Sequence, residues 1–483
     1  MKHRLLAACF LTGLLTPALA SANPEPTAYD TKSVGMALTG TTYLERPAAL
    51  ALNPANMEGI KKLGFTFNMT NLLVNQTAPV QGPNTSVSSG LGYGPLPSGF
   101  IGGRIAPRVV LVGGLYIETG YGSSFSQVEC LDGDPVAPDG GNTAPDGTPS
   151  TPNTTPPCSN LQPQDLNVTF FVGEFAVGTS FKIHEKFWLG VALRLPFSKQ
   201  VADLWQNIGA ALGGFGYARV KNDLGGVGTP ALRFGLTYKP HKKVNIGVMY
   251  RMASKIKMTG TTETDLISDP TTGGPLKLNS EADWNIPHAI AFGVSSQVTT
   301  KALIAFEARL QFHGAPKSGN INQTVTATDP NGNLPPFVIV VPFGWQNTWS
   351  AKAAFEYRFT ELFALRGGAN IAESATTQAW AQYFTPPPGL SGNVTAGFGF
   401  YWRDRNNPEI KDKYMLDLAG AFAFTTGTLG APPTDPQLIP GTDPSDPDNF
   451  IQVCSRDQVV RTGCPGDYKV LTYWASFSFT LQY

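Results

Sequence analysis

The chain has 483 residues, and its 35 Lys and Arg residues balance 35 Asp and Glu residues, so its formal net charge is zero. This balance, without a basic cluster, argues against nucleic acid as a partner. Charged residues make up 14% of the chain and aromatic residues 11%, which excludes a disordered, solvated chain.

The first 22 residues have the pattern of a secretory signal peptide. A charged segment, residues 2–4, precedes an apolar run from Leu5 to Leu15, and small residues around Ala22 form a cleavage site. No later stretch offers about 18 consecutive apolar residues, so we expect no transmembrane helix in the mature chain. The exported chain is then either soluble or inserted as a β-barrel, because only helices and closed barrels satisfy their backbone polar groups in lipid.

Residues 23–62 carry small residues and short helical patterns, but no alternation of apolar and polar side chains. The sequence Asn53-Pro54-Ala55 stands near the end of this segment, shortly before the first alternating stretch. A segment of this length has room to fold into the lumen of a barrel that would otherwise be open. We therefore predict that residues 23–62 form a hatch, meaning a plug inside the barrel.

Alternating segments dominate the remainder of the chain, residues 63–483. The clearest runs from Leu471 to Tyr483, where the odd positions are apolar and the even positions are mostly small and polar. Similar alternation begins at Leu63, Phe187 and Ile304. A period of two predicts β-strands, and the last segment exceeds the roughly 9–11 residues that a tilted membrane strand needs.

The connections between these segments fall into two classes, short turns and long loops, which together imply about 14 strands. The long loops are expected at about 78–97, 122–166, 198–221, 258–276, 313–343, 375–389 and 426–467. Alternating short and long connections are typical of an outer-membrane barrel, and a soluble β-sandwich is the alternative. We predict an all-β fold, a 14-stranded antiparallel transmembrane β-barrel in the cell outer membrane, because nearly every strand has one apolar face.

The second face of the strands carries charges of both signs. A charge facing lipid would cost about 2–4 kcal/mol at the membrane midplane, so we expect these charges to face the lumen. They are Glu174, Arg194, Arg233, Arg251, Glu307, Arg309, Lys352, Glu356, Arg358, Arg366 and Asp417. Large apolar side chains on the same face could line a ligand pocket or pack against the hatch. They are Phe170, Trp188, Met249, Tyr401, Met415 and Trp474.

The long loops hold two further features. The cysteines Cys130, Cys158, Cys454 and Cys464 form two local pairs, and an even count in an oxidising compartment predicts two disulfides. The simplest pairing is local, although four cysteines allow three connectivities, and their spacing disfavours a metal centre. Residues 201–212 show helical periodicity, which predicts an amphipathic loop helix that could capture hydrophobic molecules or simply pack.

The motif Asn53-Pro54-Ala55, its position before the first strand, the strand number and the terminal aromatic Tyr483 resemble the FadL-like family of outer-membrane transporters. That family moves long-chain fatty acids, and some of its members move aromatic hydrocarbons. The resemblance covers the whole mature chain. The inserts at 131–165 and 430–453 and the cysteine pairs depart from the family pattern, which leaves the substrate open.

The resemblance implies a route in which an apolar ligand enters an apolar pocket inside the barrel and leaves sideways through the wall. Movement of the hatch opens the way, and the gap lies where the third strand kinks. That strand is expected at Arg108–Gly122, where glycines would permit a bend or bulge, although they could equally be ordinary glycines of a glycine-rich barrel. The candidate gate residues are Gly113, Gly114, Gly120 and Gly122.

The resemblance implies passive uptake of hydrophobic molecules. We predict no enzymatic activity, because the chain lacks a Gly-x-Ser-x-Gly elbow, a His-Glu-x-x-His motif and a P-loop. No catalytic residue, cofactor or metal is expected. The expected partners are a hydrophobic small molecule, outer-membrane lipids and lipopolysaccharide, and the barrel assembly machinery through the C-terminal strand. A surface adhesin or anchor and a polar-solute porin are the alternative functions.

Overall fold

The computed structural model describes residues 28–80, 86–128, 164–207, 217–268, 274–332, 334–378, 381, 383–403, 412–429 and 466–483. The expected signal peptide at 1–22 and the expected disulfide cysteines Cys130, Cys158, Cys454 and Cys464 lie outside the described residues. Within the described ranges, no helix is both long enough and apolar enough to cross a membrane.

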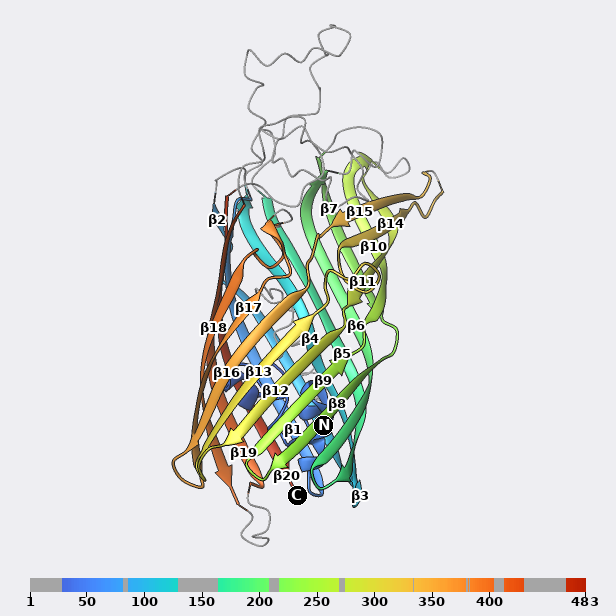
Figure 1. The fold of residues 1–483 in the computed structure, drawn as a ribbon. Coiled ribbons are helices and arrows are strands. Elements are labelled where there is room, and N and C mark those ends of the chain that lie inside the picture. The colour runs from blue at the N-terminus through green and yellow to red at the C-terminus, as the bar shows by residue number, and fades with distance from the viewer. Residues whose placement is uncertain are drawn as a thin grey trace, which may run out of the picture.

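The chain forms one closed antiparallel β-barrel that surrounds a small N-terminal domain (Figure 1). Its strands are β1 (Leu63–Ala78), β2 (Val87–Ser88), β3 (Gly92–Ala106), β4 (Val109–Val128), β5 (Gln164–His184), β6 (Phe187–Asn207), β7 (Tyr217–Val227), β8 (Ala231–His241), β9 (Val244–Arg251), β10 (Ser254–Ser268), β11 (Pro275–Ile286), β12 (Ala289–Gln297), β13 (Ala302–Gln311), β14 (Asn322–Thr328), β15 (Phe337–Pro342), β16 (Thr348–Arg358), β17 (Phe363–Glu373), β18 (Leu390–Trp402), β19 (Tyr414–Leu429) and β20 (Gly466–Gln482). The barrel closes because β1 pairs with β20 on one side and with β3 on the other.

Seventeen of these twenty strand segments make fourteen passes through the wall, as predicted. Three passes are interrupted strands, namely β7 with β8, β9 with β10, and β11 with β12. The strands β14 and β15 pair as a side hairpin, and β2 is a two-residue addition to the edge of β1. The interruptions at 228–230, 252–253 and 287–288 lie on neighbouring passes.

Side chains alternate between the lumen and the outside, which confirms the predicted sides of the wall. In β20, Phe477 and Phe479 are exposed on the outside, whereas Ser476, Ser478 and Thr480 are buried. An apolar outer face and a polar inner face are the arrangement that lipid on the outside requires. The charged residues expected in the lumen are buried, except for Arg358, which is half-buried.

Several strands extend farther than the sequence predicted. The predicted loop helix is wrong for residues 201–207, because β6 continues to Asn207, and residues 208–212 lie outside the described residues. Outward-facing ion pairs join these extensions, for example Lys199 with Asp223 and Lys257 with Glu281. The outward positions of these extensions carry polar and charged side chains, so no apolar alternation remains in the sequence to reveal the strands.

The described part of the hatch, residues 28–62, lies inside the barrel and contains three short helices (Figure 1). They are α2 (Thr31–Gly35), α3 (Ala49–Leu52) and η1 (Pro54–Gly59). The Asp30 carboxylate caps α2 by accepting hydrogen bonds from the backbone N–H groups of Lys32 and Ser33. Almost every hatch side chain is buried, because the surrounding strands cover a segment too short to have its own core.

Candidate luminal site

The motif Asn53-Pro54-Ala55 fastens the hatch to the barrel wall. The Asn53 Oδ1 atom accepts a hydrogen bond from the Ala55 N–H at 3.1 Å and so caps η1. The Asn53 Nδ2 group donates to Thr41 O at 2.7 Å and to Thr237 Oγ1 of β8 at 3.2 Å. One amide side chain therefore joins two hatch segments to a wall strand.

Two paired wall glycines form the seat for this motif. Gly190 on β6 lies opposite Gly235 on β8. A Cβ atom added to Gly190 would collide with the backbone of Pro54 and Ala55, and one added to Gly235 would collide with Asn53 Oδ1. The seat was missed in the sequence, where its only sign is a glycine at an inward position of each alternating strand.

Buried ion pairs hold the opposite side of the hatch. Arg46 lies between Asp30 of the hatch and Asp417 of β19, with N–O distances of 3.2 and 2.7 Å. Lys32 pairs with Glu356 of β16 at 3.0 Å. Burial raises the pKa of the Asp30 carboxyl and lowers the pKa of the Lys32 ammonium, while Arg46 and Glu356 oppose these shifts. Charges removed from water in this way depend on their partners.

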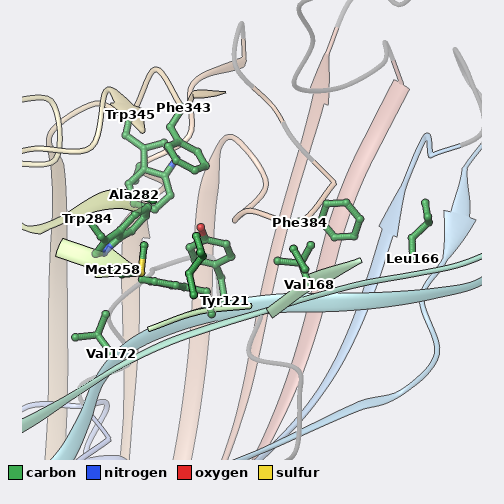
Figure 2. Packing of buried hydrophobic residues seen from close by; sticks show 14 of the residues in the cluster. Tyr121, Leu166, Val168, Val172, Met258, Ala282, Trp284, Phe343, Trp345 and Phe384 are labelled. Carbon is green, nitrogen blue, oxygen red and sulfur yellow. The ribbon is translucent and has the colours of Figure 1, made fainter. Parts of the chain in front are cut away.

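The long-loop half of the lumen contains an apolar group of side chains, which we call the aromatic cluster (Figure 2). Its central rings contact one another, with centroid distances of 5.0 Å between Tyr121 and Phe170 and 4.6 Å between Phe170 and Trp284. Trp345 lies edge-on to Trp284 at 5.4 Å. Tilted and edge-on rings are the favourable geometry for aromatic contacts, and a planar apolar guest can make the same contacts.

Two long connections complete the aromatic cluster. Residues 343–345, between β15 and β16, supply Phe343 and Trp345. The segment after β17 supplies Phe384, which packs edge-on against Phe125 of β4 at 6.0 Å. Its backbone is tied to the wall, because Ser123 Oγ donates to Tyr383 O at 3.2 Å. The connection therefore folds onto the lumen.

The side chains predicted to line a pocket do not form one group. Phe170 belongs to the aromatic cluster, and Trp474 packs between the hatch and the wall with Val34 and Leu38. The remaining four are buried elsewhere: Tyr401 and Met415 contact each other, Trp188 lies under Lys239, and Met249 lies on β9. The sequence prediction missed Tyr121, Trp284 and Trp345.

The hydrogen-bonded wall is incomplete between β3 and β4. Their pairing ends at Ser98 opposite Tyr116. Beyond this point β3 still pairs with β1 as far as Gly92, and β4 still pairs with β5 as far as Val128. Along the described residues, no pairing joins 92–97 of β3 to 117–128 of β4. Pro95 and Pro97 lie in this part of β3, as expected for an edge strand, because proline lacks an N–H group.

A β-bulge in β4 accompanies the incomplete wall. The β4–β5 register shifts between Ile117 and Thr119, so Glu118 is the extra residue. Around the bulge the alternation of burial stops, and residues 116–123 are buried at odd and even positions alike. Both faces of this segment of β4 are therefore covered.

The structure separates the four candidate gate glycines. Gly113 and Gly114 lie where β4 pairs with both of its neighbours, and Gly120 and Gly122 lie beyond the bulge. A side chain at Gly122 would collide with the β5 backbone at Val168, whereas a Cβ at Gly113 would meet nothing closer than 3.9 Å. Substitution at Gly122 would thus disturb the wall as well as the bend.

An outer-membrane β-barrel with an internal plug and an apolar cluster in a largely polar lumen is the class of protein that these features define. Residues 165–419 match the family described as "Outer membrane protein transport protein (OMPP1/FadL/TodX)". The chain belongs to this family of outer-membrane channels for hydrophobic compounds.

Solved structures with the same fold support this assignment. A Pseudomonas aeruginosa FadL homologue is 14% identical, with a TM-score of 0.66 over 97% of this chain and 99% of that one. The Ralstonia pickettii toluene transporter TbuX is 14% identical, with a TM-score of 0.64 over 96% and 100%. The P. putida toluene transporter TodX is 15% identical, with a TM-score of 0.64 over 94% and 99%. No curated protein sequence matches the chain.

Proposed function

We propose that this protein takes up small hydrophobic molecules through the aromatic cluster and releases them sideways between β3 and β4. The observation that carries this proposal is the incomplete β3–β4 pairing beside a buried apolar group. Leu96 of β3 and Ile117 of β4 belong to one buried apolar group with Val34, Leu38 and Trp474. This group connects the edge of the opening to the top of the hatch.

An apolar lining suits a hydrophobic cargo better than a polar solute. Each CH₂ group gains about 0.8 kcal/mol on leaving water for an apolar wall, whereas a water-filled pore offers no such gain. Release into the bilayer keeps the ligand out of water throughout. In the proposal, the hatch closes the lumen below the aromatic cluster, and a shift of its Val34–Leu38 segment opens the path to the wall.

The substrate we favour is a compact aromatic hydrocarbon. The cluster offers ring faces and edges from Tyr121, Phe170, Trp284 and Trp345, and two of the structures with the same fold are toluene transporters. A long-chain fatty acid is the second candidate. The observation in its favour is the second buried apolar group, with Val34, Leu96 and Ile117, which adds aliphatic surface suited to an acyl chain.

Deleting Glu118 tests the lateral route. The deletion removes the extra residue, so the β4–β5 register becomes continuous and β4 can approach β3 beyond Ser98. Uptake of radiolabelled toluene and oleate by cells should fall at least tenfold, while the folded barrel keeps its heat-sensitive gel mobility. The control is Gly113→Ala, which adds a side chain to the same strand without a collision. Normal uptake by the assembled deletion variant would refute lateral release.

A further inference from the structure

We infer that Glu118 is a positioning residue whose carboxylate holds β4 away from β3 and so keeps the wall open. This inference rests on the proposed lateral release and names the residue that maintains its exit. Glu118 has no exposed surface, although it belongs to a strand of the barrel wall. Its side chain points into the lumen, where it reaches two arginines on other strands.

Two arginines hold the carboxylate. Arg233 Nη2 of β8 lies 3.1 Å from Glu118 Oε2, and Arg251 Nη1 of β9 donates a short hydrogen bond to Glu118 Oε1. The strands β8 and β9 are separated from β4 by β5 and β6. The ion pairs therefore act from one part of the wall on another, instead of joining adjacent strands.

The arginines are themselves fixed. Arg251 donates from Nε and Nη2 to Pro287 O at 3.2 and 3.0 Å, at the interruption between β11 and β12. Arg233 donates from Nη1 to the Tyr116 hydroxyl at 2.8 Å. Because both guanidinium groups have second partners, they offer a rigid attachment point for Glu118.

The attachment of Glu118 accounts for both the bend of β4 and the exchange of its faces. An extra residue bends a strand, and the inward pull on the Glu118 carboxylate sets the direction of that bend. After Glu118 the side chains exchange faces, so Tyr121 and Phe125 enter the aromatic cluster. A free strand edge tends to pair with a neighbouring edge, and the ion pairs oppose that pairing here.

Disulfide trapping measures the opening directly. If pairing continued past Ser98 with Glu118 still bulged, Leu96 would lie opposite Thr119, at a separation that a disulfide can bridge. In the chain carrying Leu96→Cys and Thr119→Cys, we expect little cross-linking in isolated outer membranes treated with a mild oxidant. Adding Glu118→Gln, which removes the charge but keeps the side-chain shape, should raise the cross-linked fraction at least fivefold. Glu118→Asp, which restores the charge, should lower that fraction again.

The matched control is Glu307→Gln in the same double-cysteine chain. Glu307 is also buried and paired with a cation, Lys352, but that pair joins directly opposed residues of the adjacent strands β13 and β16. Cross-linking between positions 96 and 119 should remain at the parent level in this control. A rise equal to that of Glu118→Gln would overturn the inference, since any lost luminal charge would then close the wall.

Uptake by the variants without added cysteines separates the two proposals. If deletion of Glu118 abolishes toluene uptake but Glu118→Gln leaves uptake and cross-linking unchanged, lateral release stands and the positioning role is wrong. If the deletion variant takes up toluene normally, the proposed function fails first. Should Glu118→Gln not assemble, Arg233→Gln removes one partner and leaves β4 intact. An intermediate rise in cross-linking then supports the inference, and no rise overturns it.

Discussion

Gly190 and Gly235 form the seat of the hatch motif, so we predict that adding one methyl group to either of them will weaken the docking of the hatch. Gly235→Ala places a Cβ atom against Asn53 Oδ1, so the motif has to move away from β8. Overpacking of this kind costs about 1–3 kcal/mol. The displacement also weakens the bonds from Asn53 Nδ2 to Thr41 O and Thr237 Oγ1, each worth about 0.5–1.5 kcal/mol net.

Together these losses weaken docking of the hatch by about 2–4 kcal/mol, so the undocked population should rise by roughly 30-fold to 1,000-fold. Hydrogen exchange of backbone amides in residues 31–57, followed by mass spectrometry in detergent, measures that population. The barrel strands should exchange as slowly as before, because their ladders are unchanged. Gly113→Ala is the control, since its Cβ meets only atoms at 3.9 Å. Equal hatch exchange in the two variants would refute the seat.

Three further changes test other parts of the site. Trp345→Ala should weaken binding of toluene about tenfold, as followed by calorimetry, because a ring contact and its apolar area are lost. Phe292→Arg, at an exposed position of β12, should destabilise the barrel by about 2–4 kcal/mol in urea unfolding from lipid vesicles. Arg366→Met should raise hatch exchange strongly, because it leaves Asp417 and Glu356 without a partner they share, a loss of about 3–5 kcal/mol.

Each of these changes has its own comparison. Trp188→Ala removes an indole under Lys239, away from the aromatic cluster, and should leave toluene affinity intact. Ser295→Ala changes a luminal position of the same strand as Phe292 and should cost far less. Glu281→Gln breaks an exposed ion pair and should leave hatch exchange unaltered. If a variant and its comparison showed the same toluene affinity, barrel stability or hatch exchange, the role assigned to that side chain would be contradicted.

The barrel itself could be predicted because lipid imposes a simple rule on each strand. Outward positions such as Phe477 must be apolar, and inward positions such as Ser478 have no such requirement, so alternation shows in the sequence. The buried luminal charges follow from the same rule. Beyond the lipid, outward positions need not be apolar, so the ends of β6 and β10 show no alternation and were predicted as loops.

The aromatic cluster could not be read from alternation alone. The bulge at Glu118 reverses the faces of β4, so counting positions from the start of that strand places Tyr121 on the wrong side. Phe343, Trp345 and Phe384 come from connections between strands, where no periodicity exists. The glycine seat needs a partner 130 or more residues away in the sequence, and only the fold brings Asn53 to Gly190 and Gly235.

The extra residue at Glu118 also gives chain length at one position an unusual importance. Most substitutions in a membrane strand tune stability by degrees, whereas removing a single codon here would make the β4–β5 register continuous and let β4 approach β3, while Tyr121 and Phe125 still face the lumen. A single insertion or deletion at this position would therefore change the barrel between a wall that is open between β3 and β4 and one that is closed. We therefore expect that relatives of this chain with different modes of release differ in the number of residues in this strand more than in its composition.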